Sequence, residues 1–215
     1  MLWPFKRPKA GPFEGSLRAH LRQHSLTLPE PLWRLIAWLE AQGQCFRYRH
    51  GGDLFVTLSG AQNRDAVWSH IAFHVPQDLV RHWLGAEGHE STLVPLVRSA
   101  GDGSYLAVWR PDEATSVFVF LGSEGEAFVV SETVESFIAL LSMGYVQIEG
   151  RFDLSFSPEE QWQTLDAGPW PEPTRLKAWT AREFGILHPN SGEDLLPYPP
   201  GDDPFTEFVA GLASR

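Results

Sequence analysis

One stretch of 58 residues, from position 92 to position 149, decides the fold: TLVPLVRSAGDGSYLAVWRPDEATSVFVFLGSEGEAFVVSETVESFIALLSMGYVQIE. Apolar runs alternate in it with turns rich in Gly, Asp and Pro, at residues 101–103, 111–113 and 122–125. The run at 104–110 alternates in the strand period, and the run at 116–121 is almost wholly apolar, as expected of a strand buried on both faces. Strands that follow one another through short turns predict an antiparallel sheet. Two faces are expected for the strand at 104–110: Tyr105, Ala107 and Trp109 on one, and Leu106 and Val108 on the other.

A helix is predicted directly after the last of these strands. Ser131 is placed to cap its N-terminus, and Phe137, Leu140 and Leu141 form an apolar stripe. Gly144 suits its end. The segment therefore predicts a sheet with a helix packed on it.

The residues before this segment predict helices and a hairpin. The spacing of Leu32, Leu35, Ile36 and Leu39 indicates a helix over residues 29–43, and a shorter helix is expected at 16–24. Alternating residues on both sides of the turn at 50–53 predict a β-hairpin. A third strand is expected within 66–75, followed by a short helix at 77–84.

The pattern loosens after Gly150. Ser157-Pro158-Glu159-Glu160 is a capping-box start of a helix, and a Gly/Pro linker at 166–173 separates it from a helix at 174–184. Residues 187–204 hold five prolines and no periodicity, which predicts an irregular arm before a last short helix.

These elements define the expected organisation. The fold class is α+β: a central, mainly antiparallel sheet with helices packed on one side and a Pro-rich C-terminal arm. We divide the chain into a basic N-terminal segment (1–28), an α+β domain (29–150) and a helical, Pro-rich C-terminal extension packed on the domain (151–215).

Composition excludes several classes of protein. The chain of 215 residues has a formal charge of −10, which argues against a general nucleic-acid binder, because that function needs a basic face. No apolar run approaches the ~18 residues of a membrane span, so no membrane partner is expected and the expected location is the cytoplasm. The single cysteine, Cys45, excludes an internal disulfide and a multi-thiolate zinc site.

The order of motifs in the deciding segment resembles the SMI1/KNR4 family, also called the SUKH superfamily. The features that carry the resemblance are Leu93-Val94-Pro95-Leu96, Gly101-Asp102-Gly103-Ser104-Tyr105-Leu106-Ala107, Val117-Phe118-Val119-Phe120, Gly122-Ser123-Glu124-Gly125, Val129-Val130-Ser131 and Phe137-Ile138-Ala139-Leu140-Leu141. They cover about a quarter of the chain. The usual opening helix with a Leu-Pro step is not evident, and the residues after Gly150 have no clear counterpart.

The resemblance implies a non-catalytic function without a cofactor or metal. Many bacterial members resemble immunity proteins that bind and neutralise a toxin, often a nuclease, so the expected partner is a cognate toxin domain. Other members resemble regulatory scaffolds without a toxin partner, and this alternative stays open.

The charge pattern suggests where a toxin would bind. Residues 102–160 hold 11 acidic and two basic side chains. An acidic face would attract a basic nuclease and imitate the phosphates of its substrate. The residues expected on this contact face are Asp102, Trp109, Glu113, Glu124 and Glu126.

A third possibility is a metal-dependent enzyme. His70 and His74 would share a strand face, with Asp78 and His82 on the following helix, and His20 and His24 have the i, i+4 spacing that can hold zinc. No Gly-x-Ser-x-Gly nucleophile elbow and no phosphate-binding Gly-rich loop with Lys are present. The paired Glu124 and Glu126 are expected on an exposed turn, which does not suit acid–base catalysis.

Overall fold

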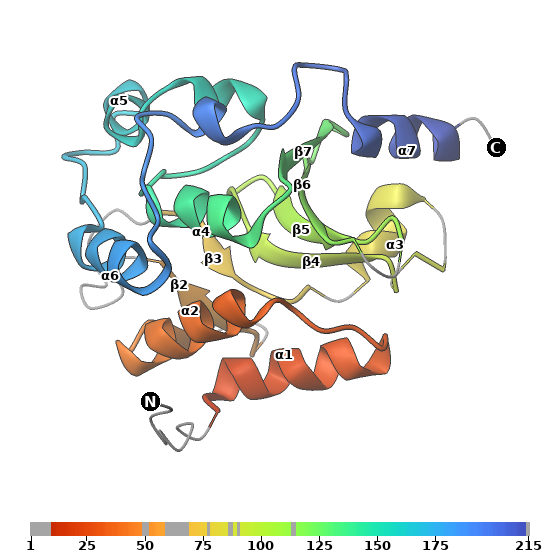
Figure 1. Ribbon diagram of the computed structural model, residues 1–215, viewed down its shortest axis with the longest axis horizontal. Coiled ribbons are helices and arrows are strands. Elements are labelled where there is room, and N and C mark those ends of the chain that lie inside the picture. The colour runs from red at the N-terminus through yellow and green to blue at the C-terminus, as the bar shows by residue number, and fades with distance from the viewer. Residues whose placement is uncertain are drawn as a thin grey trace.

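A computed structural model describes residues 10–48, 52–58, 69–76, 78–85, 88–89, 91–112 and 115–213. Seven strands form one sheet in which the strands are neighbours in chain order and every pair is antiparallel (Figure 1). The strands are β1 (Cys45–Arg47), β2 (Leu54–Thr57), β3 (Ala72–Phe73), β4 (Leu93–Arg98), β5 (Tyr105–Trp109), β6 (Val117–Leu121) and β7 (Ala127–Ser131). The α+β class with an antiparallel sheet is therefore confirmed.

Helices precede, interrupt and follow the sheet. They are α1 (Pro12–Gln23), α2 (Glu30–Ala41), α3 (Leu79–Leu84), α4 (Val134–Ser142), α5 (Pro158–Thr164), α6 (Thr174–Phe184) and α7 (Pro204–Ala213), with the 3-10 turns η1 (Arg151–Ser155) and η2 (Gly192–Leu195). The predicted strand at 66–75 is realised as the two-residue β3, and part of that prediction lies outside the described residues. The predicted short helix is α3, which ends at Gly85 in the left-handed conformation.

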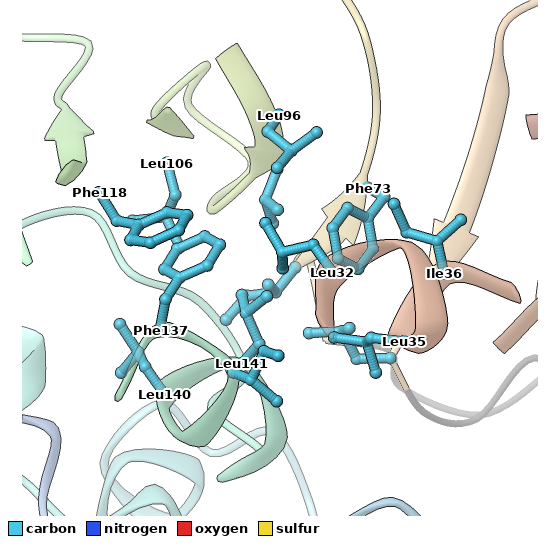
Figure 2. Packing of buried hydrophobic residues seen from close by; sticks show 14 of the residues in the cluster. Leu32, Leu35, Ile36, Phe73, Leu96, Leu106, Phe118, Phe137, Leu140 and Leu141 are labelled. Atoms are coloured by element: carbon cyan, nitrogen blue, oxygen red, sulfur yellow. The ribbon is translucent and has the colours of Figure 1, made fainter. Parts of the chain in front are cut away.

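The larger core lies between one face of the sheet and helices α1, α2, α4 and α6. Phe137 of α4 is fully buried and stacks on Phe118 of β6, with ring centroids 4.1 Å apart and planes 11° apart. Figure 2 shows these two rings beside Leu106, and the stripe of α2 beside Phe73. Burying the apolar stripes of these helices contributes most of the stability of this half of the molecule.

The opposite face of the sheet is also covered along its β4–β7 half. There α3 and α7 pack on a second apolar cluster that includes Val80, Tyr105, Trp109 and Phe205. In Figure 1, α1 and α2 lie along one side of the sheet, whereas α7 lies along the other. Helices were expected on one side only, and the placement of α3 and α7 differs from that expectation.

The cap of α4 differs from its prediction. Ser131 belongs to β7, where it pairs with Phe118, so it cannot be the first residue outside the helix. Thr133 is the N-cap instead, and its hydroxyl accepts a hydrogen bond from the amide of Ser136 at 3.2 Å. The capping box that begins α5 at Ser157 is confirmed.

Tyr145, just after α4, connects to the segment that follows Gly150. Its hydroxyl donates to the carbonyl of Phe156 at 2.7 Å and accepts from the amide of Gly192 at 2.6 Å. Burial raises the pKa of Tyr145 to about 12. The Pro-rich arm is thus held to the end of α4 by a buried phenol, and the arm then leads to α7 on the opposite face of the sheet.

Candidate functional site

The acidic residues of two turns lie at the same end of the sheet. In an antiparallel sheet, the β4–β5 and β6–β7 turns fall at one end because each strand reverses direction. Asp102 of the first turn accepts a 2.5 Å hydrogen bond from the hydroxyl of Ser123 in the second. Glu124 and Glu126 follow directly in that second turn, and both are exposed.

A third segment adds two more carboxylates. The chain after α4 returns to the start of the β4–β5 turn, where Ile148 and Ser99 exchange two hydrogen bonds of 2.8 Å. This pairing places Glu149 beside the turn, and the Glu149 amide donates to the Asp153 carboxylate at 2.6 Å. We call the carboxylates of Asp102, Glu124, Glu126, Glu149 and Asp153 the acidic end of the sheet.

Three of these carboxylates are close enough for their charges to interact. Partial burial raises the pKa of Glu149, and the negative charges of Asp102 and Asp153 raise it further, against an opposing effect of His70. The arginines of the same segments donate to the backbone: Arg98 to the carbonyls of Ala100 and Gly101, and Arg151 to that of Tyr198. The five carboxylates outnumber these two arginines, so the acidic end keeps an excess of negative charge.

Asp102 has a structural role in addition to its charge. Its carboxylate accepts hydrogen bonds from the Ser104 amide and the Ser104 hydroxyl, both at 2.8 Å, as well as from Ser123. Partial burial raises the pKa of Asp102, but the hydrogen bonds from Ser123 and Ser104 lower it by more, so the net pKa lies below its usual value. Asp102 therefore connects the two acidic turns.

We expect Asp102→Ala to destabilise the protein by about 1 kcal/mol at neutral pH, because the turns lose charge-assisted hydrogen bonds at an exposed site. A carboxylate with a lowered folded-state pKa stabilises the fold above its unfolded pKa of ~3.9, and this stability disappears as the pH falls through the folded value. Urea unfolding at pH 7 and pH 3 measures both effects. The difference in the free energy of unfolding between wild type and Asp102→Ala should be smaller at pH 3 than at pH 7. As a control, Glu124→Ala should change the free energy of unfolding by less than ~0.5 kcal/mol. An equal difference at both pH values would contradict the role of the ionised Asp102 carboxylate in connecting the two turns.

Two of the expected contact residues are not among those that the structure shows at the acidic end. Trp109 is only 5% exposed, and its ring lies 5.1 Å from that of Phe205 and 5.3 Å from that of Phe208 in α7. It was expected to contact a partner if its face of the sheet were open, but α7 covers that face, so Trp109 is a core residue. Glu113 lies outside the described residues. The structure thus brings Asp102, Glu124 and Glu126 together, and it adds Glu149 and Asp153, which sequence reasoning missed.

The histidines that the structure describes and the cysteine do not form a second site. The third alternative, a His/Asp cluster within residues 70–82, is not assembled. His74 Nδ1 is 2.7 Å from the Tyr105 hydroxyl, whereas His82 Nδ1 bonds the backbone carbonyl of Asp78. In the part of the chain that the structure describes, no three His, Cys, Asp or Glu side chains are arranged to hold a metal ion. Burial and the Glu40 carboxylate raise the pKa of Cys45 to about 11, which disfavours a reactive thiolate.

Within the described ranges, no helix has both the length and the apolar character needed to cross a membrane. No protein-family model, curated protein or solved structure matches this chain.

Proposed function

We propose that the protein is a non-catalytic immunity protein that binds and neutralises a cognate bacterial toxin through the acidic end of its sheet. The observation that carries the proposal is the convergence of Asp102, Glu124, Glu126, Glu149 and Asp153 from three separate segments onto one end of the sheet. The resemblance of residues 93–141 to the SUKH superfamily supports it.

The physical chemistry of this surface suits binding better than catalysis. Glu124 and Glu126 are exposed, and a carboxylate acting as a general acid normally needs a desolvated environment that raises its pKa. Like charges gathered on an exposed surface instead create a potential that attracts an oppositely charged protein and speeds its association. A nuclease, whose substrate channel is basic, is the partner that this charge fits best.

A growth test addresses the proposed function directly. The toxin domain encoded beside this gene would be expressed in a bacterial host with and without this protein, from separately controlled promoters. Growth should stop with the toxin alone and be restored when this protein is present. Complex formation without restored growth would favour the regulatory scaffold, and absence of both would overturn the proposal.

Charge reversal at the acidic end should weaken toxin binding. We expect Glu124→Lys with Glu126→Lys to reduce affinity by roughly 10- to 100-fold at low salt, since two attractive contacts become repulsive. The salt dependence of the remaining affinity should also fall. Titration calorimetry at two salt concentrations measures both.

The matched control carries the same change of charge elsewhere. Glu135 lies in the first turn of α4, beyond the other end of β7, and Glu159 lies in the first turn of α5; both are exposed. The Glu135→Lys, Glu159→Lys protein should retain nearly full affinity. If the two double variants bind equally well, the acidic end is not the toxin-binding surface.

A further inference from the structure

The second face of the sheet continues beyond the half that α3 and α7 cover. Across β1, β2 and β3 it carries a row of rings: Phe46 stacks on Phe55 with centroids 5.6 Å apart, and Phe55 stacks on His74 at 4.3 Å. His74 in turn bonds Tyr105, which belongs to the covered half. The aromatic row thus extends from the second core to the β1 edge.

A cavity of about 350 Å³ opens over the outer part of this row. Its lining consists of Phe46, Tyr48, Phe55, Thr57, Ser69, His70, Ala72 and Arg98. Phe46 is 37% exposed and Tyr48 is 53% exposed, so these rings are accessible from solvent. The volume falls at the small end of the ~300–1,000 Å³ typical of small-molecule sites, and it suits a compact ligand better than an extended chain.

The rings of the cavity favour a flat ligand. The planes of Phe46 and Phe55 are only 17° apart, and Tyr48 presents its ring to Phe55 at 65° with centroids 6.2 Å apart. A ring lying on such a wall can stack on one side chain while meeting the edge of another, which are the two arrangements that aromatic pairs prefer.

A cation also lines the cavity. Arg98 lines the cavity, and its guanidinium is oriented by bonds from Nε to the Ala100 carbonyl at 2.9 Å and from Nη2 to the Gly101 carbonyl at 3.1 Å. These two bonds use two of the five guanidinium N–H donors, so capacity remains for an anion. The positive charge is held in place before any ligand binds, which lowers the entropic cost of binding one.

We propose that this cavity binds a small planar aromatic molecule that carries one negative charge, such as an aryl carboxylate. The rings of Phe46 and Tyr48 contact its flat surface, and Arg98 contacts its anionic group. Phe55 supports this wall from behind, since it is itself stacked on Phe46 and His74. The cavity adjoins the acidic end, since Arg98 bonds the carbonyl of Gly101 and His70 acts on Glu149, but none of the five carboxylates of the acidic end lines it. Binding of a small molecule there is tested without the toxin.

Two probes of similar shape separate the contribution of aromatic contacts to the affinity from the contribution of charge. 2-Naphthoate and 2-naphthamide differ mainly in the charge of one group, and calorimetry or ligand-observed NMR reports their affinities for the full chain. We expect one 2-naphthoate per chain, bound at least ~10-fold more tightly than 2-naphthamide, as one charge-assisted contact of about 1.4 kcal/mol implies. Equal affinity of the two probes, or no binding of 2-naphthoate, would overturn the proposal.

Three variants assign binding to this cavity. Ala72→Leu fills the cavity, and Phe46→Ala removes one wall at a partly exposed position outside both apolar clusters. Each should weaken the affinity for 2-naphthoate at least ~10-fold. Arg98→Gln should abolish the preference for 2-naphthoate over 2-naphthamide and leave the affinity for the amide nearly unchanged. Leu187→Ala alters a side chain that is 88% exposed and serves as the control.

The outcomes distinguish the proposal from protein docking. Binding of 2-naphthoate that survives both Ala72→Leu and Phe46→Ala in folded protein would place the ligand elsewhere. If Phe46→Ala weakens toxin binding while 2-naphthoate does not bind, the cavity is part of a protein interface, and the small-molecule proposal is wrong.

Discussion

Replacing Phe137 by alanine should be among the most damaging single changes in this protein. Phe137 is fully buried, and its ring stacks on Phe118 with centroids 4.1 Å apart, so truncation removes both the burial of a ring and an aromatic pair. Phe→Ala changes in a core cost about 3–5 kcal/mol, a large part of the ~5–15 kcal/mol that stabilises a typical protein. For a chain of this size the melting temperature should fall by about 10 °C, which urea and thermal unfolding can measure.

The control for this prediction is another phenylalanine. Phe152 is 75% exposed and contacts Phe156 edge-to-face, so Phe152→Ala should cost less than ~1 kcal/mol. Similar costs for Phe137→Ala and Phe152→Ala would contradict the packing of α4 on the sheet.

The local patterns of the deciding segment predicted its structure well. β5 has Tyr105, Ala107 and Trp109 on one face and Leu106 and Val108 on the other, and the two sets belong to different apolar clusters. Such alternation is a property of each strand by itself, because successive side chains point to opposite faces. Helices α2, α4 and α6 were predictable for the same reason, since an apolar stripe depends only on near neighbours in sequence.

What covers each face was not predictable in this way. α7 lies almost one hundred residues after β5 in the chain, and its contact with Trp109 depends on the path of an irregular arm. The Thr206 hydroxyl of α7 donates to the Ala127 carbonyl of β7 at 2.8 Å, and no local sequence pattern predicts this interaction. For this reason Trp109 was expected to be a possible binding residue, and the structure shows it in the core.

The acidic end was predictable in part. Asp102 and Glu124 lie in turns that an antiparallel meander must bring to one end, so their proximity follows from strand order alone. Glu149 and Asp153 arrive only because Ile148 pairs with Ser99 after the chain has passed through α4. The sequence indicated only that Glu149 and Asp153 belong to the acidic stretch of residues 102–160, and this did not show where they lie in space.

The junction between α4 and the C-terminal extension depends on Gly144. Its φ of +98° lies in the left-handed region, which favours glycine. Its carbonyl accepts hydrogen bonds from the indole of Trp162 at 3.0 Å and from that of Trp170 at 3.1 Å. A single residue thus ends the helix and holds two tryptophans of the following segment.

Gly144→Ala should therefore cost about 3 kcal/mol or more, whereas Gly185→Ala should cost about 1 kcal/mol, as expected of a left-handed helix end alone. Both glycines have positive φ, but a Cβ on Gly144 would lie 2.6 Å from Cδ of Pro173, and a Cβ on Gly185 would meet nothing within 4 Å. Because the proline ring cannot rotate away, the backbone must shift and the two indole hydrogen bonds should weaken. Urea unfolding compares the two costs, and NMR exchange of the indole N–H protons reports the bonds of Trp162 and Trp170. Equal destabilisation by the two variants, with unchanged indole exchange, would mean that the extension is not held at Gly144, because the two substitutions differ chiefly in the contact with Pro173.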